Sequence, residues 1–594
     1  MSADSSIPPE VRIDFAKPSS ESGRSWWLRR LWSQNPFYLL SVWFVLRGTA
    51  QWFNSSTGVA FSPWPLLWLT MGYTLLMAVT GYVVIRFGRV WDDARSILLI
   101  ILLLFVQLSL IFDETLVTDP AVGRLLLTSC WAFSLILSEL LLVGLRIRLP
   151  WRFRLPYHAL LGLLFCYPLL LTAVGSRLPT DVVLWRIFLF PTAAGAILLT
   201  LIPAIRRGSA SLKQNGTPWL WPWYPWSLFV FLAICIGFRA YALSQSFDPV
   251  LGESNASAMN FSTAFGVYFL IPMILAGGCL LLEIGLVERR KFVVMLAMCV
   301  PVVCLWLAVP ATSTSGPYAA FLATVVEQAG SPIWMSLLGI LVFYTVAVCR
   351  GVALAEFALG LTCAALTRVG PQTIDLGSLS TPQWWPLIVL AAVELSLAVT
   401  RRESLPMFIA WCSAVVAMQI GIDSLPMGSN TLVSSAVVAS VMHFLLPPVL
   451  IAGSVLIIGA IYRDPFAQLL RLAGAPLLVV ATIAGCGFID NAPQSLPWWS
   501  APALVAMMSL TAWSYARLLR LPLYRLCSVV CLASGSVAMV EMVSVFLIRE
   551  SQWHGASSFV TGIACFAVAA AVSTWKAGWL RRVPAWLQQT LVMP

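Results

Sequence analysis

Long apolar stretches separated by short polar connections fill almost the whole chain beyond residue 35. A helix needs about 20 largely apolar residues to cross roughly 30 Å of hydrocarbon, and these stretches have that length. The pattern therefore predicts an all-α, polytopic transmembrane helical bundle of about 18 spans. The expected spans are 36–53, 64–85, 96–112, 125–145, 156–174, 183–205, 225–245, 261–283, 292–310, 332–349, 351–367, 384–399, 405–421, 433–461, 473–489, 498–516, 526–547 and 556–575.

The polar residues define three parts of the chain. We expect a disordered cytoplasmic tail and pre-membrane segment at 1–34, a transmembrane domain at 35–576 and a cytoplasmic tail at 577–594. The longest outward loops, near 246–260 and 311–331, are too short for a soluble domain.

Two stretches of unusual length need a decision. The stretch 332–367 is too long for one helix, so we expect two helices joined by a tight turn at Arg350-Gly351. The stretch 433–461 contains Pro447-Pro448, and we interpret it as one broken helix. Two crossings there would place all the later basic connections on the opposite side.

The basic residues predict the orientation. With the N-terminus inside, 29 of the 36 Lys and Arg residues lie in cytoplasmic connections or tails, four face out and three lie within spans. Both termini are then cytoplasmic, as the excess of Lys and Arg in inner loops requires. Composition agrees, since 59% of residues are hydrophobic and 10% are charged. The net charge of +11 is explained by loops that face anionic membrane lipids, so nucleic-acid binding is not implied.

Ionisable residues inside hydrocarbon are the candidate functional residues, because each is costly unless it is paired or neutralised. Four carboxylates lie roughly 8–10 Å from the cytoplasmic flank, at about 1.5 Å per residue. They are Glu139, Glu283, Glu356 and Glu394. If they converge, they define a polar cavity; the alternative is that each is a hydrogen-bonded packing residue.

Two further candidates lie at other depths. His443 is near mid-membrane, four residues before the Pro447-Pro448 break, and we group it with the inner acids. Glu541 lies in the outer third, where Arg47 and Arg239 are the intramembrane cations at a similar depth. We expect Glu541 to form an outer ion pair with one of these two arginines.

A similar spacing recurs in three spans that lie four spans apart, whereas span sixteen lacks the glutamate. Glu139, Glu283 and Glu394 lie in spans four, eight and twelve, six or seven residues before an arginine. A duplicated four-helix repeat would explain the recurrence, as in many transporter folds. The alternative is that the similar approaches to these spans are common helix entries and exits.

Several kinds of chemistry have no signature in the chain. The sequence contains no phosphate-binding Gly-rich loop, no zinc-protease motif and no nucleophile elbow. Its thirteen cysteines lie within or at the edge of spans and its three histidines are scattered. We therefore expect no metal, no cofactor, no direct ATP binding and no catalytic residue.

Part of the first half resembles uncharacterised polytopic inner-membrane proteins of bacterial genomes. The stretches that carry the resemblance are Asn35-Pro36-Phe37-Tyr38-Leu39-Leu40-Ser41, Trp91-Asp92-Asp93-Ala94-Arg95 and the Trp-Pro cluster before Trp226. The resemblance implies the architecture and a bacterial inner (cytoplasmic) membrane, and it carries no activity.

Three functions remain open. The first is a cation- or proton-coupled secondary transporter that uses the inner acids and His443. The second is a non-catalytic membrane scaffold or anchor subunit that binds other membrane subunits. The third is a membrane-embedded transferase acting on a lipid-linked substrate, with Asp113-Glu114 as an outward acidic pair.

Overall fold

The computed structural model describes most of the chain between residues 41 and 534. The described residues are 41–45, 47–48, 63–88, 91–172, 179–208, 215–219, 223–247, 266–309, 316–373, 380–424, 446–491 and 500–534. Within them every regular element is a helix, and there is no strand. Eleven of these helices are long and apolar enough to cross a membrane. This agrees with a multi-pass membrane protein, because a helix satisfies its backbone hydrogen bonds internally in lipid.

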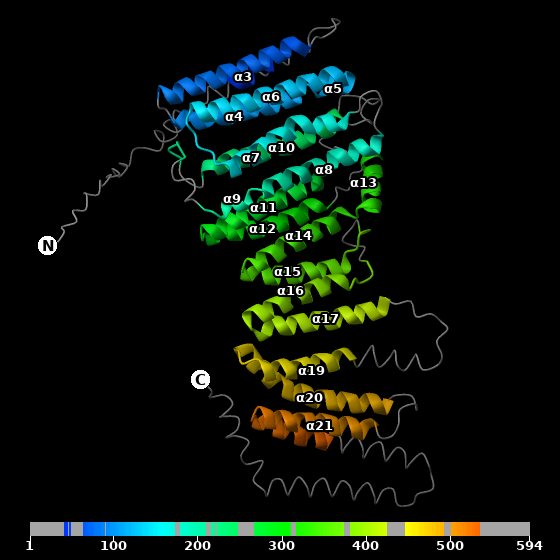
Figure 1. Cartoon of the computed structure of the whole chain (residues 1–594). Helices are drawn as coiled ribbons and strands as arrows, with labels where there is room; N and C mark the ends of the chain where they lie inside the picture. Colours follow the sequence, from blue (N-terminus) through cyan, green and yellow to red (C-terminus); the bar gives the residue numbers. More distant parts are fainter. Residues whose placement is uncertain are drawn as a thin grey trace, which may run out of the picture. The chain divides into compact units, whose positions relative to one another are not determined.

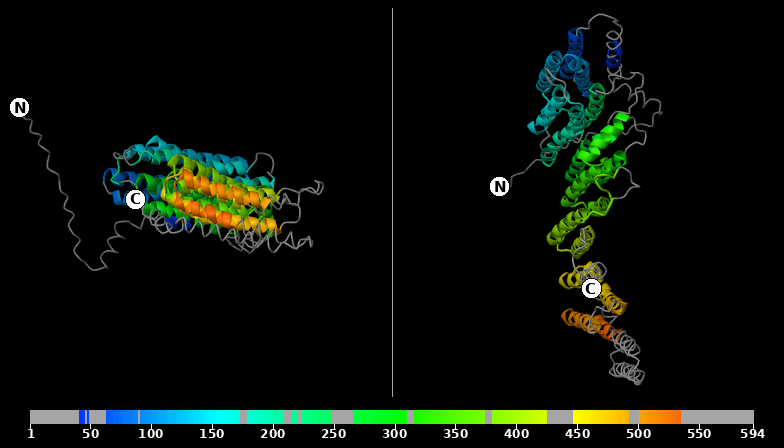
Figure 2. Two further views of the ribbon diagram at one scale, coloured as in Figure 1. Left: turned by 90° about the horizontal axis from the view of Figure 1, so that it is seen from below. Right: turned by 90° about the vertical axis from the view of Figure 1, so that its right-hand side faces the viewer.

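The chain divides into two compact units, of which the first is Met1–Ala355 with Pro371–Ser378. Its long helices lie side by side with similar axis directions, and the shorter α13 runs across them (Figures 1 and 2). Sequence neighbours pack together, as in α3 against α4 and α11 against α12, and α8 also packs on α11. The elements are α3 (Pro63–Arg86), α4 (Trp91–Leu110), α5 (Asp113–Thr118), α6 (Pro120–Gly144), α7 (Trp151–Cys166), η1 (Tyr167–Leu171), α8 (Thr180–Leu199), α9 (Ile202–Ile205), α10 (Trp223–Ser246), η3 (Val267–Leu270), α11 (Ile271–Val287), α12 (Lys291–Ala308), α13 (Gly316–Gln328) and α14 (Pro332–Cys349).

The second unit is Glu356–Gly370 with Leu379–Pro594. Its described helices pack mainly in chain order: α16 on α17, α17 on α19, α19 on α20 and α20 on α21. They are α15 (Ala353–Arg368, which enters this unit at Glu356), α16 (Trp385–Arg401), α17 (Ser404–Ser424), α19 (Leu446–Ile461), α20 (Pro465–Asn491), α21 (Ser500–Leu518) and a shorter apolar helix at Pro522–Ser534.

The core of the first unit is built from large apolar side chains of α4, α7, α8 and α10. Phe105, Phe153, Phe190 and Phe229 are almost completely buried there. The Phe153 and Phe229 rings lie 6.1 Å apart between centroids. The fully buried aromatic side chains thus fix how α7 sits against α10.

Four helices end in the same unusual way. Arg146, Arg289, Arg402 and Arg520 have φ between 54° and 57°, the left-handed region that favours glycine. They follow α6, α11, α16 and α21, which correspond to expected spans four, eight, twelve and sixteen. At α6 and α11 the next residue donates its N–H to the carbonyl five residues back, from Ile147 to Leu142 and from Arg290 to Gly285, both at 2.9 Å. An arginine in this position ends the helix and keeps a positive charge at its terminus, where the helix dipole favours it.

Most expected spans coincide with a helix, but some boundaries and one loop differ. The helices expected around Arg350-Gly351 are present: α14 ends at Cys349, α15 begins at Ala353 and Gly351 has φ +79°. The loop expected at 311–331 contains α13. The Phe321 ring of this helix packs on the Trp185 ring, with the ring centroids 6.0 Å apart. Only the part of 433–461 from Leu446 onward is described, so the broken-helix prediction lies partly outside the described residues.

Four of the described helices, α4, α6, α7 and α20, begin five or more residues before the expected apolar stretch. Helix α7 begins at Trp151 and α20 at Pro465, whereas 156 and 473 were expected. Arg154 and Arg471 therefore lie on helices and not in connections. Arg471 donates to the carbonyls of Gly459 at 2.5 Å and Tyr462 at 2.6 Å, at and just beyond the end of α19. An arginine can thus lie within a membrane helix when its guanidinium group donates to the free carbonyls at the end of the neighbouring helix.

Candidate functional site

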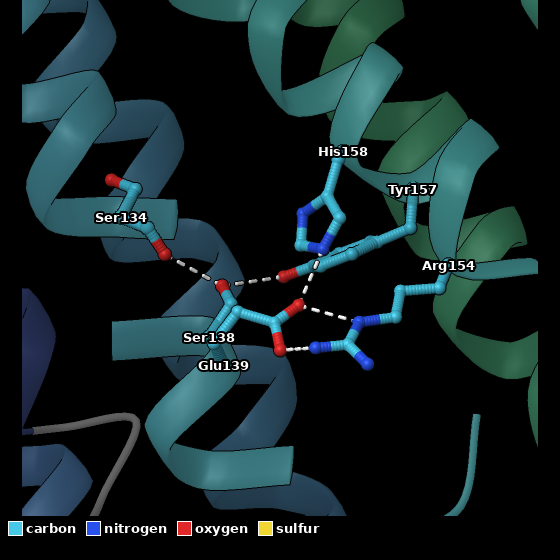
Figure 3. A network of polar contacts seen from close by, with 6 residues as sticks. All are labelled: Ser134, Ser138, Glu139, Arg154, Tyr157 and His158. Atoms are coloured by element: carbon cyan, nitrogen blue, oxygen red, sulfur yellow. Dashed lines mark hydrogen bonds and ion pairs between the residues drawn. The ribbon is translucent and has the colours of Figure 1, made fainter. Parts of the chain in front are cut away.

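Glu139 on α6 is held by two basic side chains of α7 (Figure 3). Arg154 donates its Nε to Glu139 Oε1 at 2.6 Å, and its Nη2 contacts Oε2. His158 Nε2 lies 2.6 Å from the same Oε1. Arg154 and His158 are four residues apart and so share one helix face. The Glu139 side chain is 30% exposed, and its charge is balanced by the bidentate arginine.

A second polar contact joins the same two helices one residue away. The Ser138 and Tyr157 hydroxyls lie 2.9 Å apart, and Ser138 Oγ also donates to the Ser134 carbonyl at 2.7 Å (Figure 3). Tyr157 and Ser138 are both buried. The α6–α7 contact is therefore fixed by a charged network and a neutral one side by side.

Glu283 on α11 lies between two arginines from distant parts of the first unit. Arg206, just after α9, donates to Glu283 Oε1 at 2.9 Å, and Arg350, just after α14, donates to Oε2 at 3.0 Å. The Glu283 side chain is 2% exposed, whereas Arg206 and Arg350 are 50% and 36% exposed. The hydrogen bond to Glu283 raises the pKa of Arg206 above its ordinary value. One buried carboxylate on α11 thus ties two connections together on the side of this unit that carries its arginine-rich helix ends, which we call the basic side.

Arg239 of the expected outer pair has a different neighbour from the one anticipated. Its guanidinium forms an ion pair with Asp113 at the start of α5, including Nη2 to Oδ1 at 2.8 Å. Arg47 is exposed and lies over the Trp43 ring at 5.2 Å. Glu541 lies outside the described residues, so the outer pair that we expected stays a prediction. The Asp113-Glu114 acidic pair is divided, because Asp113 is buried against Arg239 while Glu114 is exposed.

The second unit contains the other two inner acids. Arg401, the last residue of α16, lies 2.6 Å from Glu356 Oε1 on α15. Glu394 on α16 is 3% exposed, and no basic group among the described residues forms an ion pair with it. Glu356 and Arg401 are still close enough to act on it electrostatically. Arg401 therefore pairs with Glu356, and Glu394 lies near both without an ion pair of its own among the described residues. His443 lies outside the described residues.

The structure also contains an apolar cavity in the first unit, of about 110 Å³. It lies between α4, α6, α7 and α10, and none of the four inner acids lines it. Ser138 and Tyr157 lie on its wall, so the cavity adjoins the α6–α7 network.

The sequence located the inner acids but not their partners. The arginines six or seven residues beyond Glu139 and Glu283 do not bind them; the partners come from the next helix or from other connections. The available signal was the clustering of arginines at one end of every helix pair, which places several cations near any acid at that depth. Among the described residues no group of three His, Cys, Asp or Glu side chains is arranged to hold a metal ion.

Comparisons of the chain with models of protein families, with curated proteins and with solved structures found no match.

Proposed function

We propose that the chain is a bacterial inner-membrane protein of eighteen spans with both termini in the cytoplasm, and that it is a non-catalytic scaffold or anchor for other membrane subunits. One observation carries the proposal. Three of the four inner acids, Glu139, Glu283 and Glu356, are paired with arginines from other helices or connections. A carboxylate whose charge is balanced in this way holds helices together and offers no free charge to a solute.

The distribution of the acids supports the same role. Glu139 and Glu283 form separate clusters in the first unit, and the apolar cavity there is lined by neither. A carrier is expected to bring its coupling groups to one shared cavity near mid-membrane. Acids that are dispersed and individually neutralised suit a rigid helical platform better.

The scaffold proposal is tested by isolating the tagged chain from native membranes in mild detergent. We expect it to elute with other membrane polypeptides at a fixed stoichiometry, measured by native mass spectrometry. Proteoliposomes that contain the chain alone should show no solute-driven proton flux. Isolation as a lone chain or homo-oligomer, together with such a proton flux, would refute the proposal that the protein is a scaffold.

A second candidate is a cation- or proton-coupled secondary transporter, and Glu394 favours it. Glu394 is 3% exposed and, unlike the other three inner acids, forms no ion pair with a basic residue in the described part of the chain, so its carboxyl group is the one left to couple to a cation or proton. The test follows a pH-sensitive dye trapped in proteoliposomes while amino acids, sugars or organic anions are added outside. Proton uptake that Glu394→Gln abolishes and Glu403→Gln preserves would support transport. Absence of uptake for every class would exclude those classes.

A further inference from the structure

The apolar cavity lies on the basic side of the first unit. Its wall is formed by α4 from Leu98 to Phe105, by Leu141 and Leu142 at the end of α6, by Tyr157 on α7 and by Leu228 on α10. Ile147 and Leu149, from the connection after α6, close the end that faces the arginines. Leu98, Leu142 and Leu228 are partly exposed, so the cavity reaches the surface of the unit. At about 1.5 Å per residue, the α4 wall extends roughly 10 Å into the apolar layer.

Three hydroxyl groups on the wall are already engaged within the protein. Ser138 and Tyr157 bond each other, and the Tyr224 hydroxyl donates to the Arg148 carbonyl at 3.2 Å. A polar solute would therefore find few free hydrogen-bonding groups, and its own groups would lose their water without compensation. The lining selects an apolar occupant. An engineered cavity of about 150 Å³ holds one benzene, so the space fits a short hydrocarbon segment.

The connection after α6 places charge directly outside this cavity. In Leu145-Arg146-Ile147-Arg148-Leu149, the three aliphatic residues are buried and the two arginines are exposed. The left-handed turn at Arg146 and the bond from the Arg148 N–H to the Asn215 carbonyl, at 2.8 Å, hold this alternation in place. Among the described residues no carboxylate pairs with Arg146, Arg148 or Arg152, whereas Arg154 is neutralised by Glu139. A positive rim thus borders an apolar cavity.

We propose that this cavity binds an acyl-chain segment of an anionic phospholipid whose phosphate lies beside Arg146 and Arg148. An anionic headgroup complements Arg146 and Arg148, and the acyl chain fills a space whose walls are mainly apolar. The site goes beyond the scaffold role and does not depend on it. It requires only that the first unit is embedded in a bilayer.

The test uses the full chain in nanodiscs that contain a phosphatidylglycerol with a diazirine in the first half of one acyl chain. After illumination, mass spectrometry locates the crosslinked residues. We expect crosslinks in 98–105 and at Tyr157, at least several-fold above those from a phosphatidylcholine with the same chain. Equal crosslinking from the neutral lipid, or crosslinks spread evenly over lipid-facing helices, would overturn the proposal.

Two matched pairs of variants separate this site from general lipid contact. Leu228→Trp fills the mouth of the cavity, whereas Val230→Trp places the same ring on a lipid-facing position of α10 that is 57% exposed. We expect a several-fold loss of the 98–105 crosslinks in L228W and no such loss in V230W.

Replacing Arg146 and Arg148 with Gln should reduce phosphatidylglycerol labelling to the phosphatidylcholine level. Replacing Arg289 and Arg290 in the same way should not, and the opposite pattern would contradict the site. If L228W does not fold, the wild-type lipid comparison and the arginine pairs still decide the result.

Discussion

Arg239 and Asp113 form an ion pair in which neither side chain reaches the surface of the first unit, at 0% and 2% exposure. The pair joins α10 to the short helix α5. Removing one member of a buried pair leaves the other charge without compensation, and this costs about 3–5 kcal/mol. We therefore expect Asp113→Asn to lower the free energy of unfolding by about that amount, measured by denaturation in mixed micelles.

The control for this pair is the neighbouring acid. Glu114 is exposed, so Glu114→Gln should change the unfolding free energy little. The double replacement Asp113→Leu with Arg239→Met should recover a large part of the loss, because no charge is then left buried. Equal effects of D113N and E114Q would contradict the importance of the pair.

Glu283 should be a second point of sensitivity. Glu283→Gln removes the negative charge that both arginines contact: the amide oxygen still accepts from one of them, but the amide NH2 faces the other as a second donor. A hydrogen bond to a charged group is worth about 1.5–3 kcal/mol before screening of the exposed arginines. Glu288→Gln, one turn away, breaks only the surface contact with Arg290, whose side chain is 60% exposed, and should cost less than about 1 kcal/mol. Chemical denaturation of the two purified variants measures their free energies of unfolding. A smaller decrease for E283Q than for E288Q would contradict the stabilising role of Glu283 and its two arginines.

The hydrogen bonds of Asp464 predict how the stability of the second unit depends on pH. Burial by itself raises the pKa of Asp464, but the Ser404 hydroxyl at 2.7 Å and the Ser404 N–H at 3.1 Å donate to its carboxylate and bring the pKa below its ordinary value. The charged form therefore stabilises the fold. This contribution is fully present above the ordinary pKa of about 3.9 and is lost as the pH falls through the lower pKa of the folded protein.

The measurement is the thermal midpoint of wild type and Asp464→Asn from pH 7 down to about 3. The two midpoints should differ at pH 7 and converge at the acid end. Ser404→Ala removes the hydroxyl donor and should reduce the difference, whereas Glu403→Gln, at an exposed neighbouring position, should keep it. A gap between wild type and D464N that widens towards low pH would show that the sign is wrong.

The orientation is the prediction that depends most directly on the sequence. Reporter fusions at Arg289 and at the C-terminus should be cytoplasmic, and fusions after Phe112 and Phe247 should be external. Phosphatase and fluorescent-protein fusions at the same positions give opposite readouts and serve as mutual controls. A C-terminus or an Arg289 fusion outside the membrane would refute the eighteen-span arrangement.

The helical architecture followed from hydrophobicity because the membrane imposes both the length and the backbone pairing of each span. The helix starts at Trp151 and Pro465 could not be located in this way. Arg154 and Arg471 lie inside these helices because acceptors on neighbouring helices bind their guanidinium groups. A hydropathy profile contains no information about such contacts between helices. Helix α13 was missed for a related reason, since its packing on Trp185 is a tertiary contact.

The candidate site was predictable in position and not in pairing. An acid such as Glu283 can be assigned a depth by counting residues, but its partners Arg206 and Arg350 are 77 and 67 residues away in sequence. The four-helix repeat stays a proposal. It gains support from the left-handed arginines after every fourth expected span, a regularity of backbone shape that residue types alone did not disclose.

The distance along the chain between the two members of an ion pair determines when each helix can take up its buried position during synthesis. Glu139 meets Arg154 only 15 residues later, so the α6–α7 hairpin neutralises its own charge as soon as it is synthesised. Asp113 meets Arg239 only after 126 further residues. Until α10 has emerged from the ribosome, α5 carries a carboxylate without its cation and cannot settle into its buried place. Nascent chains halted before Arg239 should therefore leave α5 accessible to water-soluble reagents, whereas chains halted shortly after α10 should protect it. A helix made early in the first unit thus reaches its buried place only after a helix made much later has supplied its counter-ion.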